Sequence, residues 1–412
     1  MKSPEEQLET LSRGVVDFVS PQDLLERLRE SAKTGRPLRV KVGFDPTRPD
    51  LHLGHTVVMN KMRQFQELGH EVVFVVGDFT AAIGDPSGRN KTRPPLSRED
   101  IVAGAESYAE QAFKILDRER TRIAYNGTWL GPMGFADVVR LAGKYTLARM
   151  MERQDFKMRW EEGQSISIHE LLYPLAQAQD SVHLECDVEM GGTDQLFNLM
   201  VGRDLMKESG QKPQIVMTTP ILEGLSARWE VGEDGKGRIV GDKMSKSLDN
   251  YVGIAEPPAT QVGKLMSIGD ELMWRYYELL SSLSSAEIAA RKAGAMSPRD
   301  AKMALAVEIV TLYHGAEAAA AAKAGWEKQF SRGEVPDDIA EIVVESAGEP
   351  VPLVKALVTA GLAASNSEAR RKIDEGAVKT AAGDKLGDSK GTLPVGRHVL
   401  KLGRKWAAIV VR

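Results

Sequence analysis

Short apolar runs alternate with longer amphipathic stretches along the first half of the chain. Residues 37–44 and 71–77 are apolar, as expected of buried strands, and the stretch from about 53 to 68 has a helical pattern that Gly69 ends. Further strands are expected at residues 121–125, 182–188 and 214–218. Strands that alternate with helices favour an α/β fold with a doubly wound parallel sheet. Ligands of such sheets bind beyond the carboxyl ends of the strands, near the switch point.

The remaining stretches indicate further domains. Residues 126–180 are mostly helical in pattern and interrupt the series of strands, so we expect an insertion between the two halves of the sheet. Residues 257–330 are helical, and 331–350 are mixed and acidic, as in a linker. The last part has short helices, with residues 365–367 as N-cap candidates, and strands that end at 406–411. Because 412 residues exceed one ordinary core, three domains are expected, at residues 1–256, 257–335 and 350–412.

Composition favours a globular protein of the cytoplasm. The sequence is 42% hydrophobic and 27% charged. It has no apolar run near the roughly 20 residues that span a bilayer, so no membrane contact is expected, and its first residues do not have the pattern of a targeting peptide. The single cysteine, Cys186, excludes an internal disulfide and fits a reducing compartment; its apolar neighbours predict an inert thiol in a buried strand. No His/Cys cluster has zinc-ligand spacing, so no structural metal is expected.

Charge is spread unevenly along the chain. The net charge is −4, whereas residues 351–412 contain 12 Lys and Arg against 5 Asp and Glu, a local charge of +7. A basic tail on an acidic body predicts a polyanionic partner held by one end of the molecule, although an ordinary solvated basic face would have the same composition.

Two motifs suit chemistry on a nucleoside triphosphate. The first expected strand ends in Gly-Phe-Asp-Pro-Thr (43–47) and leads into His52-Leu-Gly-His55, which places two histidines on one face of the first turn of a helix, where backbone N–H groups attract anions. Gly54 lets a base or ribose approach the backbone. Much later, Lys-Met-Ser-Lys-Ser (243–247) provides Lys243 and Lys246, which could follow a migrating pyrophosphate.

Together the two motifs are similar to the signatures of class I aminoacyl-tRNA synthetases, and nearly the whole chain resembles the bacterial tyrosyl-tRNA synthetases with an unaltered KMSKS. The resemblance implies a Rossmann-like catalytic domain with a helical insertion, a helical anticodon-binding domain and a small α+β S-four-type RNA-binding domain. It implies that ATP and tyrosine give tyrosyl-adenylate and pyrophosphate, and that tyrosine then passes to the 3′ end of tRNA(Tyr). It also implies a homodimer formed through the insertion, and RNA contacts by Arg370, Arg371 and Lys372.

The expected tyrosine site lies on one helix face. Tyr173, Gln177 and Asp180 are spaced at i, i+4 and i+7, and a buried carboxylate is a suitable acceptor for a phenol hydroxyl. Apolar residues beside them also allow the plainer interpretation of a packed helix with a polar edge. By resemblance, Asp180 accepts from the substrate phenol, while Tyr173, Gln177 and Asp85 surround the ammonium. The residues that the resemblance implies for tyrosine are Gly43, Asp85, Tyr173, Gln177, Asp180 and Gln195.

The expected nucleotide site combines the two motifs with a glycine pair. By resemblance, Asp194 accepts from the ribose of ATP and Gln195 donates to the substrate carboxylate, with Mg2+ bridging the phosphates. Arg89 and Arg93 could reach the leaving phosphates, or be exposed loop arginines. The implied catalytic residues are His52, His55, Arg89, Arg93, Lys243 and Lys246. The implied ATP-binding residues are Asp45, Thr47, His52, Gly54, His55, Gly192, Asp194, Lys243, Met244 and Lys246.

Two features depart from the family pattern. Lys41 stands where the other bacterial variety has a tyrosine that contacts the substrate hydroxyl, so Asp180 acts alone, with water, or with a further partner. Residues 227–241 are longer than the usual approach to KMSKS and predict a small hairpin around residues 233–237, to which the sequence assigns no function.

Three other interpretations compete with this one. A tryptophanyl-tRNA synthetase has the same fold and signatures, but the face formed by Tyr173, Gln177 and Asp180 argues against it. A small-molecule adenylyltransferase has the histidine turn but is usually shorter and lacks KMSKS. A non-catalytic RNA-binding relative would not be expected to keep both histidines, both lysines and Asp194.

Overall fold

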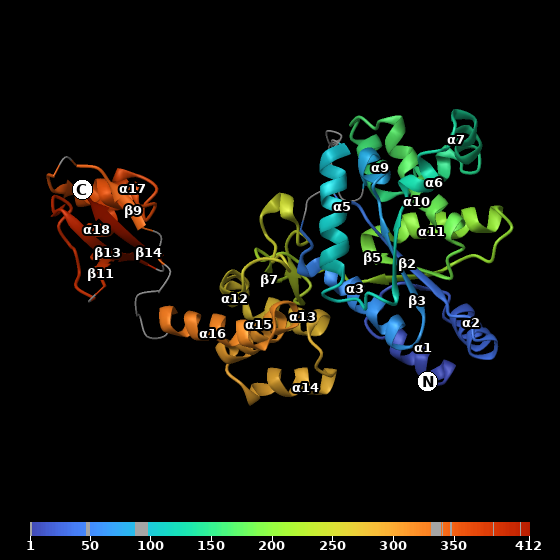
Figure 1. Cartoon of the computed structure of the whole chain (residues 1–412), viewed down its shortest axis with the longest axis horizontal. Helices are drawn as coiled ribbons and strands as arrows, with labels where there is room; N and C mark the ends of the chain where they lie inside the picture. Colours follow the sequence, from blue (N-terminus) through green and yellow to red (C-terminus); the bar gives the residue numbers. More distant parts are fainter. Residues whose placement is uncertain are drawn as a thin grey trace. The chain divides into compact units, whose positions relative to one another are not determined.

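The computed structural model describes residues 2–46, 50–86, 98–330, 339, 341–346, 348–381, 383–403 and 405–412. The chain forms two compact units, Met1–Gly315 and Ala316–Arg412 (Figure 1). The expected domain boundaries near residues 256 and 335–350 remain predictions beside this division.

A six-stranded sheet forms the centre of the first unit in the described part of the chain. Its strands are β1 (Phe18–Val19), β2 (Arg39–Phe44), β3 (Glu71–Val76), β4 (Thr121–Tyr125), β5 (Val188–Gly192) and β6 (Ile215–Thr219). The order is β1-β6-β5-β2-β3-β4, and all neighbouring pairs are parallel except β1 with β6. The predicted doubly wound parallel sheet is therefore confirmed, with a two-residue antiparallel edge that is too short to give a sequence pattern. Strand order reverses at β2, so the switch point lies between β2 and β5.

Helices lie to both sides of this sheet in Figure 1. Those outside the insertion are α1 (Pro4–Ser12), α2 (Pro21–Thr34), α3 (Leu53–Glu67), α4 (Thr80–Ile83), α5 (Arg98–Ala112) and α11 (Leu196–Glu208). Local sequence sets their ends: α2 begins after Ser20, whose hydroxyl accepts from the Asp23 N–H, and ends at Gly35, which takes a left-handed conformation. Helix α3 agrees with the expected helix at residues 53–68.

The predicted insertion is helical and lies between β4 and β5. It contains α6 (Gly127–Leu130), α7 (Phe135–Ala142), α8 (Leu147–Met150), α9 (Gln154–Glu161) and α10 (Ile168–Leu184). The predicted strand at residues 182–188 is wrong, because α10 runs to Leu184 and β5 begins only at Val188. Leu175, Ala178 and Val182 belong to one apolar cluster, so the helical repeat of α10 prevails over the short alternation read from the sequence.

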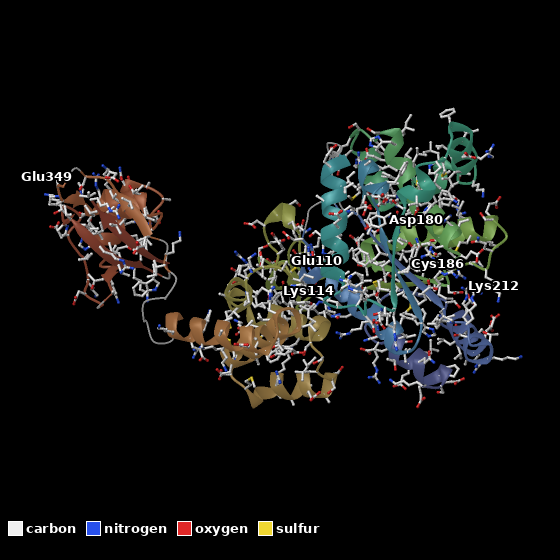
Figure 2. All side chains as sticks on the ribbon, in the orientation of Figure 1. Glu110, Lys114, Asp180, Cys186, Lys212 and Glu349 are labelled. Atoms are coloured by element: carbon white, nitrogen blue, oxygen red, sulfur yellow. The ribbon has the colours of Figure 1, made fainter. Side chains whose placement is uncertain are left out.

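Cys186 therefore lies in the turn between α10 and β5 rather than within a strand (Figure 2). Its thiol is buried, and this burial raises the pKa of Cys186 to about 12. An inert thiol is thus confirmed, although its secondary structure differs from the expectation.

A hairpin and a group of helices complete the first unit. The hairpin joins β7 (Arg228–Val231) to β8 (Gly237–Val240), as predicted for residues 227–241. The helices that follow are α12 (Pro258–Ser267), α13 (Asp270–Leu280), α14 (Ser285–Ala290) and α15 (Pro298–His314). Their core side chains include Trp274, Tyr276 and Tyr277 of α13.

The second unit begins with α16 (Ala316–Phe330). Its other elements are β9 (Glu341–Val344), β10 (Val351–Pro352), α17 (Leu353–Thr359), α18 (Asn366–Asp374), β11 (Val378–Thr380), β12 (Thr392–Leu393), β13 (Gly396–Leu402) and β14 (Lys405–Val411). A sheet in the order β11-β13-β14-β9 shares an apolar core with α17 and α18. Ser365 is the N-cap of α18, as expected.

Part of the predicted linker is wrong. Residues 341–344 form β9, which pairs in parallel with β14, so this stretch belongs to the sheet of the second unit. Exposed and more buried side chains alternate along it, as in a half-buried strand, but its sequence, Glu-Ile-Val-Val, does not alternate between polar and apolar residues and therefore did not indicate this. Among the residues described, none of the helices combines the length and the apolar character required to cross a membrane.

Candidate active site

A pocket of about 310 Å3 lies at the switch point of the sheet. The carboxyl ends of β2 and β5 contribute Gly43 and Gly192 to it, so it lies where parallel sheets bind ligands. The sequence-predicted residues that line it are Gly43, Asp45, His52, Gly54, His55, Asp85, Tyr173, Gln177, Asp180, Gly192, Asp194, Gln195, Lys243, Met244 and Lys246. Thr47, Arg89 and Arg93 lie outside the described residues, and Arg370, Arg371 and Lys372 belong to the second unit.

The two histidines at the start of α3 are held by backbone hydrogen bonds. The Gly54 N–H donates to His52 Nδ1 at 3.1 Å, and the His52 N–H donates to His55 Nδ1 at 3.1 Å. Burial, followed by the nearby lysines, lowers the pKa of His55 to about 3, and burial also holds the pKa of His52 well below its usual value. Both rings are therefore neutral at pH 7. Since each Nδ1 accepts, each proton is on Nε2, which is a donor suited to a phosphate oxygen.

The histidine motif and KMSKS are in direct contact. Met244 is buried, and a Cβ added to Gly54 would lie 3.5 Å from the Met244 Cβ and 3.0 Å from the His52 ring. An alanine at position 54 would therefore crowd the His52 ring, while its distance from Met244 would be an ordinary van der Waals contact. Backbone bonds join the same regions, since the Leu53 N–H donates to the Val252 carbonyl at 3.0 Å.

The lysines of KMSKS have partners in this structure. Lys243 Nζ lies 2.6 Å from Asp194 Oδ2, and Lys246 Nζ donates to the Tyr108 hydroxyl at 3.1 Å. The Lys243 side chain is 45% exposed, so its cation can change partner at small desolvation cost. Asp194 is the residue expected to receive ribose, and binding of ATP would compete with this ion pair.

At the other end of the pocket, Asp180 is buried on α10 (Figure 2). The Trp129 Nε1–H donates to its Oδ1 at 2.8 Å, and the Asn126 amide donates to its Oδ2 at 3.3 Å. Burial raises the pKa of Asp180 to about 6, opposed chiefly by the charge of Lys41. Asp180 is therefore mainly ionised at pH 7, with lone pairs available to a phenol hydroxyl.

Other polar residues that line the pocket form hydrogen bonds with one another. The Tyr173 hydroxyl donates to Asp45 Oδ2 at 2.9 Å, and burial raises the pKa of Asp45 to about 7. The Gln195 amide donates to Asp85 Oδ2 at 2.8 Å. Asp45 and Asp85 both line the pocket and lie near enough for their charges to interact, which suits a substrate that carries an ammonium group.

Gln177 lines the pocket, and its expected role beside the substrate ammonium stays a prediction. Its amide donates to Glu189 Oε1 at 3.1 Å. Lys41 forms an ion pair with the same carboxylate at 2.9 Å, and both side chains are 1% exposed. Lys41, the residue that departs from the family pattern, is thus part of a buried polar group that contacts Gln177, one of the residues expected to bind tyrosine.

Sequence reasoning missed several residues that support the pocket. Asn126 and Trp129 hold Asp180, Thr80 donates to Asp45 at 2.7 Å, and Asn250 accepts from the Ser245 N–H at 2.7 Å. Two signals were available: Asn126 directly follows β4 at the carboxyl edge of the sheet, and Glu189 is a charge within an apolar strand. Across the described ranges, no group of three or more His, Cys, Asp or Glu side chains could hold a metal ion.

Comparison with known proteins defines the class. Residues 33–331 match the family model described as tRNA synthetases class I (W and Y), so the chain belongs to this family. The chain is 51% identical to "Tyrosine--tRNA ligase" of Oleidesulfovibrio alaskensis over 99% of both chains. It is 51% identical to the protein of that name from Geobacter sulfurreducens over 98% of both. Within the family, the chain belongs with the tyrosine–tRNA ligases.

Solved structures agree on the fold. A C-terminally truncated mitochondrial tyrosyl-tRNA synthetase of Aspergillus nidulans superposes with a TM-score of 0.62 at 24% identity, covering 80% of this chain and 95% of that one. The Archaeoglobus fulgidus enzyme complexed with L-tyrosine superposes with a TM-score of 0.60 at 23% identity, covering 78% of this chain and all of that one. At these identities the likeness concerns the fold.

Proposed function

We propose that this enzyme activates tyrosine with ATP and transfers it to the 3′-terminal adenosine of tRNA(Tyr). The observation that carries the proposal is a single pocket lined both by Asp180, Tyr173 and Gln177 and by His52, His55 and Lys246. A phenol acceptor and a set of phosphate donors in one pocket suit the binding of tyrosine and ATP together.

The first step needs no nucleophile from the protein. A carboxylate oxygen of tyrosine attacks the α-phosphorus of ATP, the bond from that phosphorus to the bridging oxygen breaks, and pyrophosphate leaves with the electron pair. The neutral Nε2–H groups of His52 and His55 donate to phosphate oxygens, and Lys243 and Lys246 neutralise the charge that grows on the leaving group. Mg2+ bound together with ATP would add to the charge neutralisation that Lys243 and Lys246 provide.

The second step uses the adenylate as the acyl donor. A ribose hydroxyl of the terminal adenosine attacks the carbonyl carbon of tyrosyl-adenylate and loses its proton, and AMP departs with the electron pair of the broken bond. Asp194 and Gln195 would hold the ribose and the former carboxylate during this step, because both line the pocket together with the glycine pair.

ATP–pyrophosphate exchange with each of the twenty amino acids tests the proposal. We expect exchange with tyrosine and none with tryptophan, because Asp180 is an anionic acceptor in a pocket lined by Tyr173 and Gln177. Exchange that depends on tryptophan would overturn the assignment in favour of the closest alternative, and no exchange with any amino acid would favour a non-catalytic relative.

We also propose a homodimer formed through the insertion. Large apolar side chains of the insertion are exposed in the single chain, among them Phe135 at 85%, Trp160 at 72% and Ile168 at 80%. Light scattering should give twice the mass of one chain, and Phe135→Glu/Ile168→Glu should give a monomer. Val395→Glu, which changes an exposed apolar residue of the second unit, is the control and should remain dimeric.

The second unit is proposed to bind tRNA as an S-four-type domain. Arg370 and Arg371 are exposed on α18, and Lys372 beside them forms an ion pair with Glu375 at 2.9 Å. Arg370→Glu/Arg371→Glu should weaken tRNA binding and its salt dependence while adenylate formation is unchanged. Charge reversal is preferable to removal of residues 351–412, which would leave β9 without β14. Unchanged charging would show that this basic face has no role in RNA binding.

A cytoplasmic location is also proposed, because the proposed partner is tRNA.

A further inference from the structure

The feature that the activity leaves unexplained is the ion pair under the tyrosine end of the pocket. Lys41 of β2 and Glu189 of β5 are neighbours in the parallel ladder, and Lys41 Nζ lies 2.9 Å from Glu189 Oε1. A buried ion pair adds little stability over an apolar pair of similar volume, since desolvation of both charges offsets their attraction. Stability by itself therefore does not account for two charges in the middle of the central sheet.

Both partners of the pair bind the helix that carries Asp180. Lys41 Nζ donates to the Gln177 carbonyl at 3.3 Å, and Glu189 accepts from the Gln177 amide and the Ser181 hydroxyl, each at 3.1 Å. Gln214 completes the set of donors to Glu189. Residues 177 and 181 lie three positions before and one after Asp180 on α10, so the pair fixes the backbone on either side of that carboxylate.

The pair also sets the charge balance at Asp180. Lys41 is the cation whose charge most favours ionised Asp180, and Glu189 opposes it. Burial alone lowers the pKa of Lys41, but Glu189 and then Asp180 more than offset this, and the net pKa of Lys41 is raised, so the ammonium stays charged. The other titratable groups near Asp180 are Asp45, which contributes a repulsive charge to the same cluster, and His183, whose ring stacks on Trp129 at 4.5 Å.

We propose that Lys41 and Glu189 form a positioning and specificity-determining pair, in which Lys41 keeps Asp180 anionic as the phenol acceptor and Glu189 restrains both Lys41 and α10. This inference rests on the proposed function. An anionic Asp180 rejects phenylalanine because the carboxylate would lose its phenol donor, whereas an uncharged Asp180 would tolerate that loss more easily. Discrimination by the substrate hydroxyl is well known for tyrosyl enzymes; what is new is that the buried pair at 41 and 189 controls it.

Opposite changes in pH dependence distinguish this role from a merely structural one. Lys41→Met removes the charge that favours ionised Asp180. In a plot of kcat/KM for tyrosine against pH, the fall on the acidic side (the acidic limb) should therefore move to higher pH. Glu189→Gln removes the opposing charge, while Asp180 still favours the charged form of Lys41, so the same limb should move to lower pH. If the limb of Lys41→Met lies about one pH unit higher, kcat/KM for tyrosine measured below both limbs falls roughly tenfold.

The two substrates should respond differently to Lys41→Met. Tyrosine loses its favourable anionic acceptor, while phenylalanine meets an uncharged carboxyl that is less costly to leave without a phenol donor. The ratio of kcat/KM for tyrosine to that for phenylalanine should therefore decrease in Lys41→Met and be kept in Glu189→Gln. Lys61→Met is the matched control, because Lys61 is also buried but donates to the carbonyls of Leu11 and Arg13 at 3.1 and 2.6 Å, away from the pocket.

Each single variant leaves one buried charge without its partner and could fail to fold for that reason. The double variant Lys41→Met/Glu189→Gln removes both charges and avoids this problem. It should fold and place the acidic limb between those of the two single variants. The proposal would be overturned if the acidic limbs do not move, or if they move in the same direction in both single variants. It would also be overturned if Lys61→Met lowers the ratio of kcat/KM for tyrosine to that for phenylalanine as much as Lys41→Met does. The unmodified enzyme separates the two hypotheses: if it activates an amino acid other than tyrosine, the proposed function fails, whereas tyrosine activation with unmoved limbs defeats only this inference.

Discussion

The residues proposed to bind the nucleotide and those proposed to bind tyrosine, called here the nucleotide end and the tyrosine end of the pocket, differ in how their charges are held. At the nucleotide end, the buried groups are neutral histidines, and the lysine cation nearest solvent, Lys243, is 45% exposed. At the tyrosine end, the buried groups are charged: Lys41 and Glu189 are paired at 1% exposure, and Asp180 lies beside them.

This difference follows from what each end has to do. Charge moves at the nucleotide end as pyrophosphate departs, so cations that remain partly solvated can change partners at small cost, and neutral donors need no counter-ion. Charge is static at the tyrosine end, where a fixed acceptor must recognise one hydroxyl. Buried ions are costly to leave unpaired and hence hold a fixed geometry. The two ends should therefore respond to different perturbations.

The largest expected effect is at the tyrosine end. Asp180→Ala removes the phenol acceptor and leaves the Trp129 and Asn126 donors without it. Truncation of one partner of a buried, hydrogen-bonded charge pair costs about 2–5 kcal/mol in binding, so kcat/KM for tyrosine in pyrophosphate exchange should fall by roughly 30- to 5000-fold. ATP binding should change little.

A matched control separates chemistry from folding. Asp187→Ala removes a carboxylate that pairs with Arg27 at 2.9 Å and does not line the pocket. It should lower thermal stability without changing the KM for tyrosine. If folded Asp180→Ala protein keeps tyrosine-dependent exchange, Asp180 does not recognise the substrate.

The next effect concerns the nucleotide end. His55→Ala removes one neutral N–H donor to the phosphates, and loss of a donor of this kind costs about 2.7 kcal/mol in the transition state, or about 100-fold in the activation rate. The dissociation constant for tyrosine, measured by equilibrium dialysis, should stay unchanged. His55→Gln, which keeps an N–H donor, should recover part of the rate. A parallel collapse of tyrosine binding would show that His55 is structural.

The sequence predicted those parts of the site whose residues lie close together in the chain, and missed those whose residues lie far apart. The histidine turn, KMSKS and the face of Tyr173, Gln177 and Asp180 are spaced along short segments, and all lie in one pocket as expected. The partners of Lys41 and of Asp180 were not predictable, because they come from segments far apart in sequence: Glu189 is 148 positions from Lys41, and Asn126 is 54 from Asp180.

The fold shows the same distinction. Strands β2, β3, β4 and β6 were identified from apolar runs, because a buried strand has a local pattern. The boundary between α10 and β5 was misplaced, since apolar residues at 182 and 184 fit a helix end and a strand start equally, and contacts of α10 with α11 decide between them. Strand β1 has only two residues and owes its existence to pairing with β6.

A pH titration sharpens the comparison further. In the proposed function, tyrosine recognition needs ionised Asp180, whose pKa burial raises to about 6, and is favoured by ionised Asp45, whose pKa burial raises to about 7. Both values are raised above those of free carboxyls, so protons bind as pH falls through 7 and 6, and the KM for tyrosine should rise by up to about tenfold between pH 8 and 6. His55, with a pKa of about 3, does not titrate in this range. Because Asp45 is also among the residues expected to contact ATP, the KM for ATP, corrected for titration of ATP itself, should rise less than the KM for tyrosine; an equal or larger rise would contradict the comparison.

The smallest expected effect comes from two buried asparagines that support opposite ends. Asn250 accepts from the Ser245 N–H at 2.7 Å and donates to the Lys243 carbonyl at 3.2 Å, which holds the KMSKS backbone. Asn198 accepts from Arg153 at 2.9 Å and donates to Gln195 at 3.0 Å, which holds the tyrosine end.

Each asparagine is a control for the other, because Asn250→Ala and Asn198→Ala make the same chemical change at nearly equal burial. Loss of hydrogen bonds worth about 1 kcal/mol should change the affected parameter about fivefold. We expect Asn250→Ala to lower kcat for activation with the KM for tyrosine unchanged, since only the lysine segment loosens. Asn198→Ala should raise the KM for tyrosine with little change in kcat, since Gln195 and Arg153 lose their common partner. Steady-state pyrophosphate exchange measures both parameters in both variants. If the two substitutions alter the same parameter, the ends of the pocket are mechanically coupled, and the division between a static recognition end and a mobile nucleotide end does not hold.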